Sequence, residues 1–245
     1  MYQYRKTLYN KYYQTQSGRR SEREINDKLK QDSWHFQQEI IPLLPKVVSQ
    51  PNIIDIGCGF GSLVHALQQH GYQKVRGIDL SPDQVAEAEK IGIKGVEQAD
   101  LIEYLKKHPN TFDVIIGIDI IEHFSKDELV EILEIIQLGL CSKGIAVFRT
   151  PNADALFSSL YMFGDFTHET ILNNSSAEQL FHSTGFSKVT VTGSCMKIKN
   201  PIKEFLRIIL WKLTVVFSKT FIFASGRSSK GLIFSPNIII SAQKN

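Results

Sequence analysis

The chain has few cysteines, and its first residues lack a long apolar run. Its three cysteines, Cys58, Cys141 and Cys195, are widely spaced, and no two of them have the CxxC spacing. This pattern argues against a disulfide framework and against a zinc site, so we expect reduced thiols with a packing role. The positive charges of the first residues are not followed by the apolar run of a secretory signal, so we expect a cytoplasmic protein.

Acidic residues are scarce at both ends of the chain. Residues 1–33 carry 8 basic (Lys/Arg) and 4 acidic (Asp/Glu) residues. Residues 34–195 carry 11 basic and 20 acidic residues, and residues 196–245 carry 9 basic residues and 1 acidic residue. An acidic centre between two basic flanks indicates an anionic partner that is met at one side. The sequence contains no recognisable nucleic-acid-binding module, so we do not expect nucleic acid to be that partner.

Uninterrupted apolar stretches of membrane-spanning length are also missing. The most apolar stretch, residues 205–224, is broken by Arg207, Lys212 and Lys219, and a cation near the centre of a spanning helix costs about 2.5 to 3.5 kcal/mol. We therefore expect an amphipathic helix that lies either on the protein core or on a membrane surface. The second alternative would give residues 203–224 a peripheral contact with the inner face of a membrane.

From about residue 52, short β-branched runs alternate with helical patterns, which is typical of a mostly parallel sheet covered by helices on both faces. Predicted strands cover residues 53–56, 74–78, 95–99, 112–118, 145–149, 188–192 and 237–242. Helices are predicted to begin at Ser81-Pro82, at Ser125 with Glu128, and at Ser175 with Glu178, and to end at Gly92, at Lys143-Gly144 and at Gly185. A further helix is predicted over residues 33–44.

The segment "IIDIGCGFGSL" is the strongest local signal for a binding site. A buried strand ends near Asp55 and leads into Gly57, Gly59 and Gly61, after which a helix begins near Ser62. Glycines there let the backbone turn tightly and approach a ligand, and the helix start presents unpaired N–H groups. The dinucleotide fingerprint GxGxxG would need its third glycine at position 62, which argues against a dehydrogenase.

Two carboxylates follow at the ends of the next predicted strands. Asp79 in "GIDLSP" lies where a carboxylate accepts both ribose hydroxyls of an adenosine, and Asp100 in "AD" would suit the adenine amine, with Leu101 against the ring. Either residue alone would more simply cap a helix. At successive strand ends beside the glycine turn, ligand roles are favoured.

In these motifs, and in "FDVIIGIDIIEHF", the sequence closely resembles the class I S-adenosylmethionine-dependent methyltransferases over residues 50–192. The resemblance implies an α/β fold with a Rossmann-like seven-stranded sheet whose seventh strand inserts antiparallel, and S-adenosylmethionine as cofactor. It implies one domain, with an N-terminal helical arm and helix (1–45), a cofactor-binding core (50–192), a helical insertion (193–235) and a last strand (236–245). The implied cofactor-binding residues are Asp55, Gly57, Cys58, Gly59, Gly61, Asp79, Leu80, Asp100, Leu101 and Asp119.

Methyl transfer to a hydroxyl requires removal of a proton, and "DIIEH" supplies candidates for that step. His123 is our predicted general base, with Glu122 beside it. The stretch also resembles the metal-binding ExxEH element of ubiquinone-pathway O-methyltransferases, but Asp119 replaces the first glutamate, so a divalent metal is not favoured. Alternatively, Glu122 and His123 merely begin the next helix.

A second polar cluster follows the fifth predicted strand, in "TPN" and "GDFTHE". We expect Asp165 and His168 to contact the methyl acceptor, with His168 counted among the catalytic residues. The cluster resembles bacterial methyltransferases of surface-polysaccharide pathways, as do "LYNKYYQTQ" at the start and "NIIISAQK" near the end. The tyrosines of the first segment would then either close over a sugar or pack as an amphipathic helix.

The function that follows is O-methylation of a saccharide hydroxyl in bacterial glycan or glycolipid assembly, with an anionic sugar or lipid-linked glycan as acceptor. Within the same class, the alternative is an O-methyltransferase for a small quinone or phenolic metabolite. The alternative from a different functional class is a non-catalytic cofactor-binding module that binds to a membrane or to a glycosyltransferase.

Overall fold

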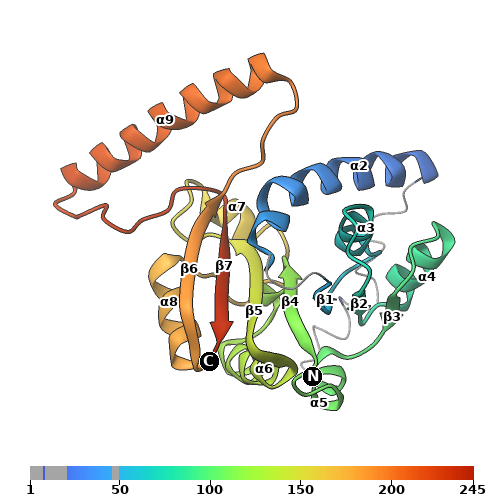
Figure 1. The fold of residues 1–245 in the computed structure, drawn as a ribbon. Coiled ribbons are helices and arrows are strands. Elements are labelled where there is room, and N and C mark those ends of the chain that lie inside the picture. The colour runs from blue at the N-terminus through green and yellow to red at the C-terminus, as the bar shows by residue number, and fades with distance from the viewer. Residues whose placement is uncertain (1–7, 9–20, 46–49) are drawn as a thin grey trace.

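The computed structural model describes residue 8, residues 21–45 and residues 50–245, and these contain a seven-stranded sheet (Figure 1). The strand order is β3-β2-β1-β4-β5-β7-β6, and β7 alone runs antiparallel to its neighbours. The strands are β1 (Ile53–Ile56), β2 (Val75–Asp79), β3 (Val96–Gln98), β4 (Phe112–Ile118), β5 (Leu140–Pro151), β6 (Phe186–Ser194) and β7 (Asn237–Lys244). The predicted fold and the antiparallel seventh strand are confirmed.

Helices cover both faces of this sheet, because neighbouring side chains along each strand point to opposite sides. Ile53 belongs to a core with α2 (Glu22–Glu39), α3 (Ser62–Gln69) and α4 (Pro82–Lys90). Ile54 belongs to a second core with α5 (Leu101–Lys107), α6 (Lys126–Gly139) and α8 (Asn174–Ser183). Short helices η2 (Ile41–Leu43), η3 (Ile121–His123) and α7 (Ser158–Met162) complete the turns.

Several predicted helix ends are confirmed by their caps. Ser81 caps α4 with Pro82 at its first position, and Ser125 forms a capping box with Glu128 at the start of α6. Gly92 and Gly185 follow the ends of α4 and α8 with positive φ, as helix-terminating glycines do.

Three predicted boundaries are wrong. The helix expected over residues 33–44 is α2, which begins eleven residues earlier because Ser21 and Glu24 form a capping box, and which ends at Glu39 before the proline-containing η2. The capping box before α8 is formed by Asn173 with Ser176, whose side chains bond the opposite backbone groups, rather than by Ser175. Helix α6 ends at Gly139 rather than at Lys143-Gly144, because β5 already begins at Leu140.

The predicted tyrosine-rich arm lies almost entirely outside the described residues. The predicted insertion is described, and it contains α9 (Pro201–Ala224), which projects from the end of the sheet where β6 stops and β7 starts (Figure 1). Only Ser218 is buried in this helix. Its exposed apolar side chains are Ile202, Phe205, Leu206, Ile208, Ile209, Leu210, Leu213, Val216, Phe217, Phe221 and Phe223.

Within the part of the chain that the structure describes, no helix combines the length and the apolar character needed to cross a bilayer.

Candidate active site

The glycine turn lies at the carboxyl end of β1, at the edge of the sheet where the parallel strands end. The peptide N–H groups of Gly57 and Cys58 both donate to the carbonyl of Ile78 in β2, at 2.8 and 3.0 Å. The three glycines have φ values of 67°, 55° and 81°, which side-chain-bearing residues rarely adopt. The turn then enters α3 at Ser62, as the sequence predicts.

The glycines differ in what surrounds them. A Cβ on Gly57 would collide with Ile120, and one on Gly61 would lie 2.7 Å from Val96, so these two positions are closed by protein. A Cβ on Gly59 would meet only Gln84, at 3.8 Å. Gly59 is therefore the point of the turn where the backbone leaves room for a ligand to approach.

Asp79 holds the turn in place from the end of β2. Its Oδ2 accepts from the Gly59 N–H at 2.8 Å, and its Oδ1 accepts from the Ser81 N–H at 2.8 Å. Burial raises the pKa of Asp79, and the two N–H donors oppose that shift. Each carboxylate oxygen has more than one acceptor site, so these bonds are compatible with the predicted ribose contact.

Asp55 provides an observation that points to a bound cation. Its side chain is fully buried at the end of β1, and its Oδ1 has no hydrogen-bond partner. Burial, with Asp79 nearby, raises the pKa of Asp55 well above the usual range. S-adenosylmethionine carries both an ammonium and a sulfonium charge, so a buried carboxyl with an unpaired oxygen at this strand end fits this cofactor.

The predicted adenine-side residues lie at the next strand end. Oδ1 of Asp100 caps α5, accepting from Ile102 and Glu103 N–H at 2.9 and 3.0 Å, while Leu101 packs partly against the core. Leu80 is exposed. Asp100 thus performs the capping role considered from the sequence, and a ligand contact through its second oxygen stays a prediction.

The side chain of Cys58 packs inward, and its sulfur fills the space beside Gly77 in β2. Burial raises the pKa of this thiol well above its usual range. Any cofactor contact of Cys58 would therefore come from its backbone.

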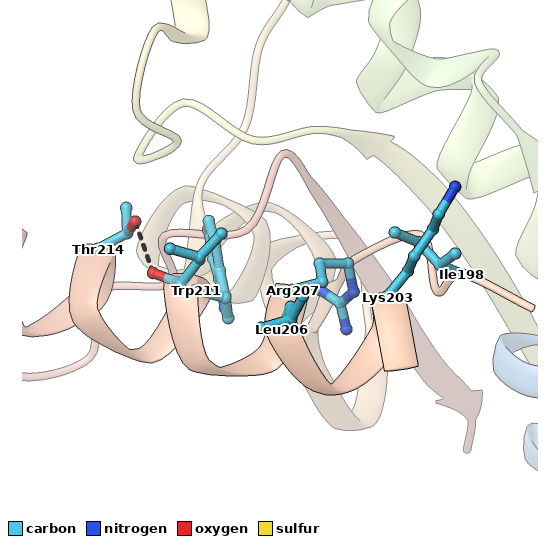
Figure 2. Close-up of a pocket in the computed structure, with 7 residues that line it drawn as sticks. Ile198, Lys203, Leu206, Arg207, Trp211 and Thr214 are labelled. Carbon is cyan, nitrogen blue, oxygen red and sulfur yellow. Dashed lines mark hydrogen bonds between the residues drawn. The ribbon is translucent and has the colours of Figure 1, made fainter. Parts of the chain in front are cut away.

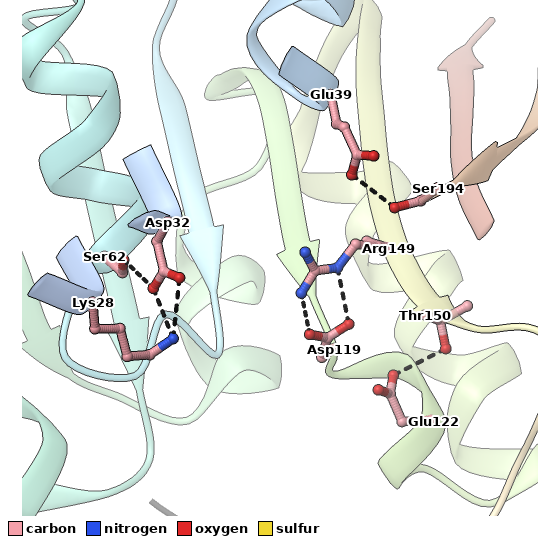
Figure 3. Close-up of polar contacts among 9 residues, drawn as sticks. All are labelled: Lys28, Asp32, Glu39, Ser62, Asp119, Glu122, Arg149, Thr150 and Ser194. Carbon is pink, nitrogen blue, oxygen red and sulfur yellow. Dashed lines mark hydrogen bonds and ion pairs between the residues drawn. The ribbon is translucent and has the colours of Figure 1, made fainter. Parts of the chain in front are cut away.

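Helix α2 is fastened to the start of α3, next to the glycine turn. Asp32 accepts from the Ser62 hydroxyl at 2.7 Å and forms an ion pair with Lys28 at 2.8 Å (Figure 3). Asp32 is not recognisable from the sequence, because its partner lies thirty positions away and no local pattern marks the pair.

Asp119, at the end of β4, is paired with Arg149 of β5 through two hydrogen bonds, one of them 3.1 Å long (Figure 3). Asp119 has a φ of 53°, and its N–H donates to the Arg149 carbonyl. The Arg149 side chain is largely buried, and the carboxylate raises its pKa against the effect of burial. The resemblance implied a cofactor contact for Asp119, and the ion pair with Arg149 was not foreseen.

Glu122 is buried in η3, immediately after this pair. It accepts from the Thr150 hydroxyl at 3.0 Å, and its own carbonyl accepts from the N–H groups of Glu169 and Thr170. Burial, together with the charge of Asp119, raises the pKa of Glu122 to about 8. Its carboxyl group therefore holds a proton at neutral pH. Glu122 links β5, through its side chain, to the loop that carries His168, through its backbone carbonyl.

His123 is held in one tautomer by Thr167. The Thr167 hydroxyl lies 2.8 Å from Nδ1 of His123 and 2.6 Å from Oδ1 of Asp165. The carboxylate can only accept, so the hydroxyl donates to Asp165 and accepts from Nδ1–H, which leaves the lone pair on Nε2. Burial and the nearby His168 lower the pKa of His123 to about 4, so the ring is neutral at physiological pH.

His168 lies against His123, with ring centroids 4.8 Å apart. Its Nδ1 donates to the Tyr161 carbonyl at 2.8 Å, which again places the lone pair on Nε2. Glu122, His123 and His168 each offer a ligand atom within 4.8 Å of the others, so they could hold a divalent metal ion. The structure thus brings together the three residues predicted to be catalytic.

Asn152, in the predicted "TPN" element, has a structural role. Its side-chain amide donates to the carbonyls of Ile233 and Ser235, and its oxygen accepts from the Asp154 N–H. The segment that returns from α9 is therefore attached to the end of β5.

The family model for a methyltransferase domain matches residues 25–191. The fold is similar to that of a SAM-dependent methyltransferase from Archaeoglobus fulgidus, with a TM-score of 0.62, 20% identity, and coverage of 96% of this chain and 99% of that one. For a Haemonchus contortus phosphoethanolamine N-methyltransferase 2 in complex with S-adenosyl-L-methionine, the TM-score is 0.61 and the sequence identity is 17%. The match covers 96% of this chain and 60% of that one. At these identities the similarity concerns the fold.

Curated relatives match shorter segments. A norajmaline N-methyltransferase from Rauvolfia serpentina is 37% identical over 84 residues, which is 31% of this chain and 28% of the relative. A ubiquinone biosynthesis O-methyltransferase from Saccharophagus degradans is 31% identical over 81 residues, 31% of this chain and 34% of the relative. The match thus spans about a third of the length of these relatives, which methylate different kinds of atom.

Proposed function

The chain belongs to the class I S-adenosylmethionine-dependent methyltransferases, and we propose that it methylates a saccharide hydroxyl, with His123 taking the hydroxyl proton. The observation that carries the proposal is the chain of hydrogen bonds from Asp165 through Thr167 to Nδ1 of His123. A histidine fixed in this tautomer has its basic nitrogen, Nε2, turned away from its support. This is the arrangement that general-base catalysis needs.

S-adenosylmethionine, when bound, supplies an electrophilic methyl group on a sulfonium sulfur. Asp55 would lie toward its cationic end, Asp79 would accept from its ribose hydroxyls, Gly59 would give room for its approach, and Asp100 with Leu101 would receive the adenine. The protein's contribution is then to orient the acceptor oxygen, to exclude water and to receive a proton at Nε2 of His123.

The low pKa of His123 suits a base that is not protonated before the acceptor arrives. The negative charge of Asp165 opposes the lowering of this pKa by burial and by His168. Thr167 positions the ring and connects it to this carboxylate. We assign His168, whose ring touches His123, to contact with the acceptor.

A saccharide acceptor is supported by the segment that carries Asp165. Phe157, Phe163 and Phe166 are each at least 75% exposed, and exposed aromatic faces beside polar groups are typical of ligand-binding surfaces. The basic flanks would favour an anionic acceptor such as a sugar nucleotide or a lipid-linked glycan of bacterial glycan assembly. The resemblance of "TPN" and "GDFTHE" to polysaccharide-pathway methyltransferases supports the same class.

A second candidate is favoured by the grouping of Glu122, His123 and His168. A divalent metal held there would activate a phenolic hydroxyl, as expected for a small quinone or phenolic acceptor. In that case His123 would be a metal ligand and could not serve as the free base. The two candidates therefore make opposite predictions for chelation.

The test measures transfer of a labelled methyl group to sugar nucleotides, lipid-linked glycans and catechol-type phenols, with and without EDTA. The proposal expects transfer to a saccharide that EDTA does not affect and that His123→Ala lowers without loss of S-adenosylhomocysteine binding. Unchanged turnover of His123→Ala would remove it as the base. Transfer to phenols only, lost with EDTA and restored by metal, would establish the second candidate.

A further inference from the structure

Helix α9 leaves most of its apolar side chains exposed, and most of its less exposed positions are polar. The less exposed side carries Glu204, Arg207, Thr214 and Ser218 together with Trp211, Val215 and Ile222. Figure 2 shows Arg207, Trp211 and Thr214 beside Lys203 and Leu206 around a shallow pocket of the helix. Amphipathic helices of globular proteins show the reverse pattern, with the apolar stripe toward the core. The orientation therefore needs a partner outside the described chain.

The exposed apolar face runs along the helix and is interrupted at its centre only by Thr220. At about 100° per residue, it is centred on the line through Ile202, Ile209, Leu213 and Val216, with Leu206 and Phe217 beside it. The eleven exposed apolar side chains of α9 have between 38% and 81% of their surface accessible. Scattered exposed apolar residues are ordinary, but a contiguous face of this kind marks an interaction surface.

Lysines border the apolar face. Lys212 and Lys219, seven residues apart, lie along one border, and Lys203 lies along the other. The only acid among residues 196–245 is Glu204, and it is engaged by Arg207 through bonds of 2.7 and 2.6 Å. The partner must therefore combine an apolar interior with a negative surface.

We infer that α9 lies in the surface of a membrane that contains anionic lipids, with its apolar face among the acyl chains and its lysines at the headgroups. A 24-residue helix is about 36 Å long and lies flat, in agreement with the finding that no helix of the described residues is suited to span a bilayer. A second copy of this chain fits less well. Pairing two such faces would bring their bordering lysines together without acids to match them.

The position of α9 gives this membrane contact an orientation. The helix leaves β6 at Ser194 and returns to β7 at Asn237, which pairs with Pro151 at the carboxyl end of β5. This is the edge of the sheet where Thr150 contacts Glu122. Phe163 and Phe166, both exposed, belong to the segment after β5 that also carries His168. If the proposed function holds, the site faces acceptors that are carried on lipids.

The inference is tested by flotation of the full chain with vesicles of phosphatidylcholine, alone or with phosphatidylglycerol. Two variants probe the two parts of the surface: Ile209→Asp with Leu213→Asp on the apolar face, and Lys212→Gln with Lys219→Gln at its border. Lys90→Gln with Lys94→Gln removes the same charge from exposed positions on and after α4 and is the matched control. S-adenosylhomocysteine binding by each variant verifies the fold.

We expect the wild type and the control to float with the phosphatidylglycerol vesicles and to bind phosphatidylcholine less. The lysine variant should bind about thirtyfold more weakly, since each basic residue near an anionic surface contributes about 1 kcal/mol, and the apolar variant should not float. Absence of wild-type flotation would overturn the inference, whatever the methyltransferase activity. So would flotation that both variants retain, or a dimer that the apolar variant dissociates while vesicles bind nothing.

Discussion

The hydroxyl of Thr167 lies 2.8 Å from Nδ1 of His123 and determines which nitrogen of that ring carries the proton. The residues are separated by 44 positions and come from η3, which follows β4, and from the loop before α8. Thr167 is buried, so water does not readily replace its hydroxyl. The relationship makes Thr167 a positioning residue for the proposed base.

Replacing Thr167 tests this role without touching the imidazole. We expect Thr167→Val to lower kcat by about tenfold, and His123→Ala to lower it by about a hundredfold or more, because general bases contribute about 10² to 10⁴. Thr167→Ser, which keeps the hydroxyl, should retain most activity. Equal kcat values for Thr167→Val and the wild type would contradict the positioning role.

The glycine turn offers a matched pair of substitutions. Gly59→Ala and Gly61→Ala both place a side chain at positive φ, which costs about 1 to 2 kcal/mol. Only Gly61→Ala also brings a methyl group to 2.7 Å from Val96. We expect urea unfolding to show the larger loss of stability for Gly61→Ala. We expect calorimetry to show that Gly59→Ala weakens S-adenosylhomocysteine binding more, when each loss of affinity is compared with the loss of stability of the same variant. The reverse order would place the ligand elsewhere.

Glu122 predicts a pH dependence of stability. Its pKa rises from 4.5 to about 8 on folding, so the folded protein holds a proton that the unfolded chain releases. The free energy of unfolding should therefore fall as the pH rises from about 4.5 to 8, by an amount on the order of a few kcal/mol. Glu122→Gln keeps an acceptor for Thr150 but cannot ionise, so its unfolding midpoint should depend less on pH.

The measurement is urea unfolding of both proteins across this pH range, with EDTA present so that metal binding does not contribute. A parallel pH dependence in the wild type and in Glu122→Gln would show that Glu122 is not the group responsible.

The sequence predicts the sheet well because its signals are local. The ranges of β1 and β4 agree with prediction to the residue, since each is a short β-branched run with clear ends. The start of α2 was missed although Ser21 and Glu24 form a recognisable capping box. The early end of α6 was missed because Lys143 and Gly144 resemble a helix stop but lie within the span of β5.

For the site, the sequence identifies residues but not their pairings. Because Asp55, Asp79 and Asp119 lie at the carboxyl ends of predicted parallel strands, the sequence predicts that they share one edge of the sheet. The pairing of Asp119 with Arg149 depends on the register between β4 and β5, which no local pattern encodes. The same holds for Thr167 and His123, whose contact depends on how a loop folds back over η3.

The most direct test of the account is a calorimetric titration of the wild type and Asp79→Ala with S-adenosylhomocysteine, with NAD as the control ligand. Asp79 holds Gly59 in place and faces the proposed ribose site, so we expect binding by the wild type, no response to NAD, and at least about tenfold weaker binding by Asp79→Ala. Lys90→Gln with Lys94→Gln should bind as the wild type does. Failure of the wild type to bind S-adenosylhomocysteine, or equal binding by Asp79→Ala, would contradict a cofactor site at the glycine turn.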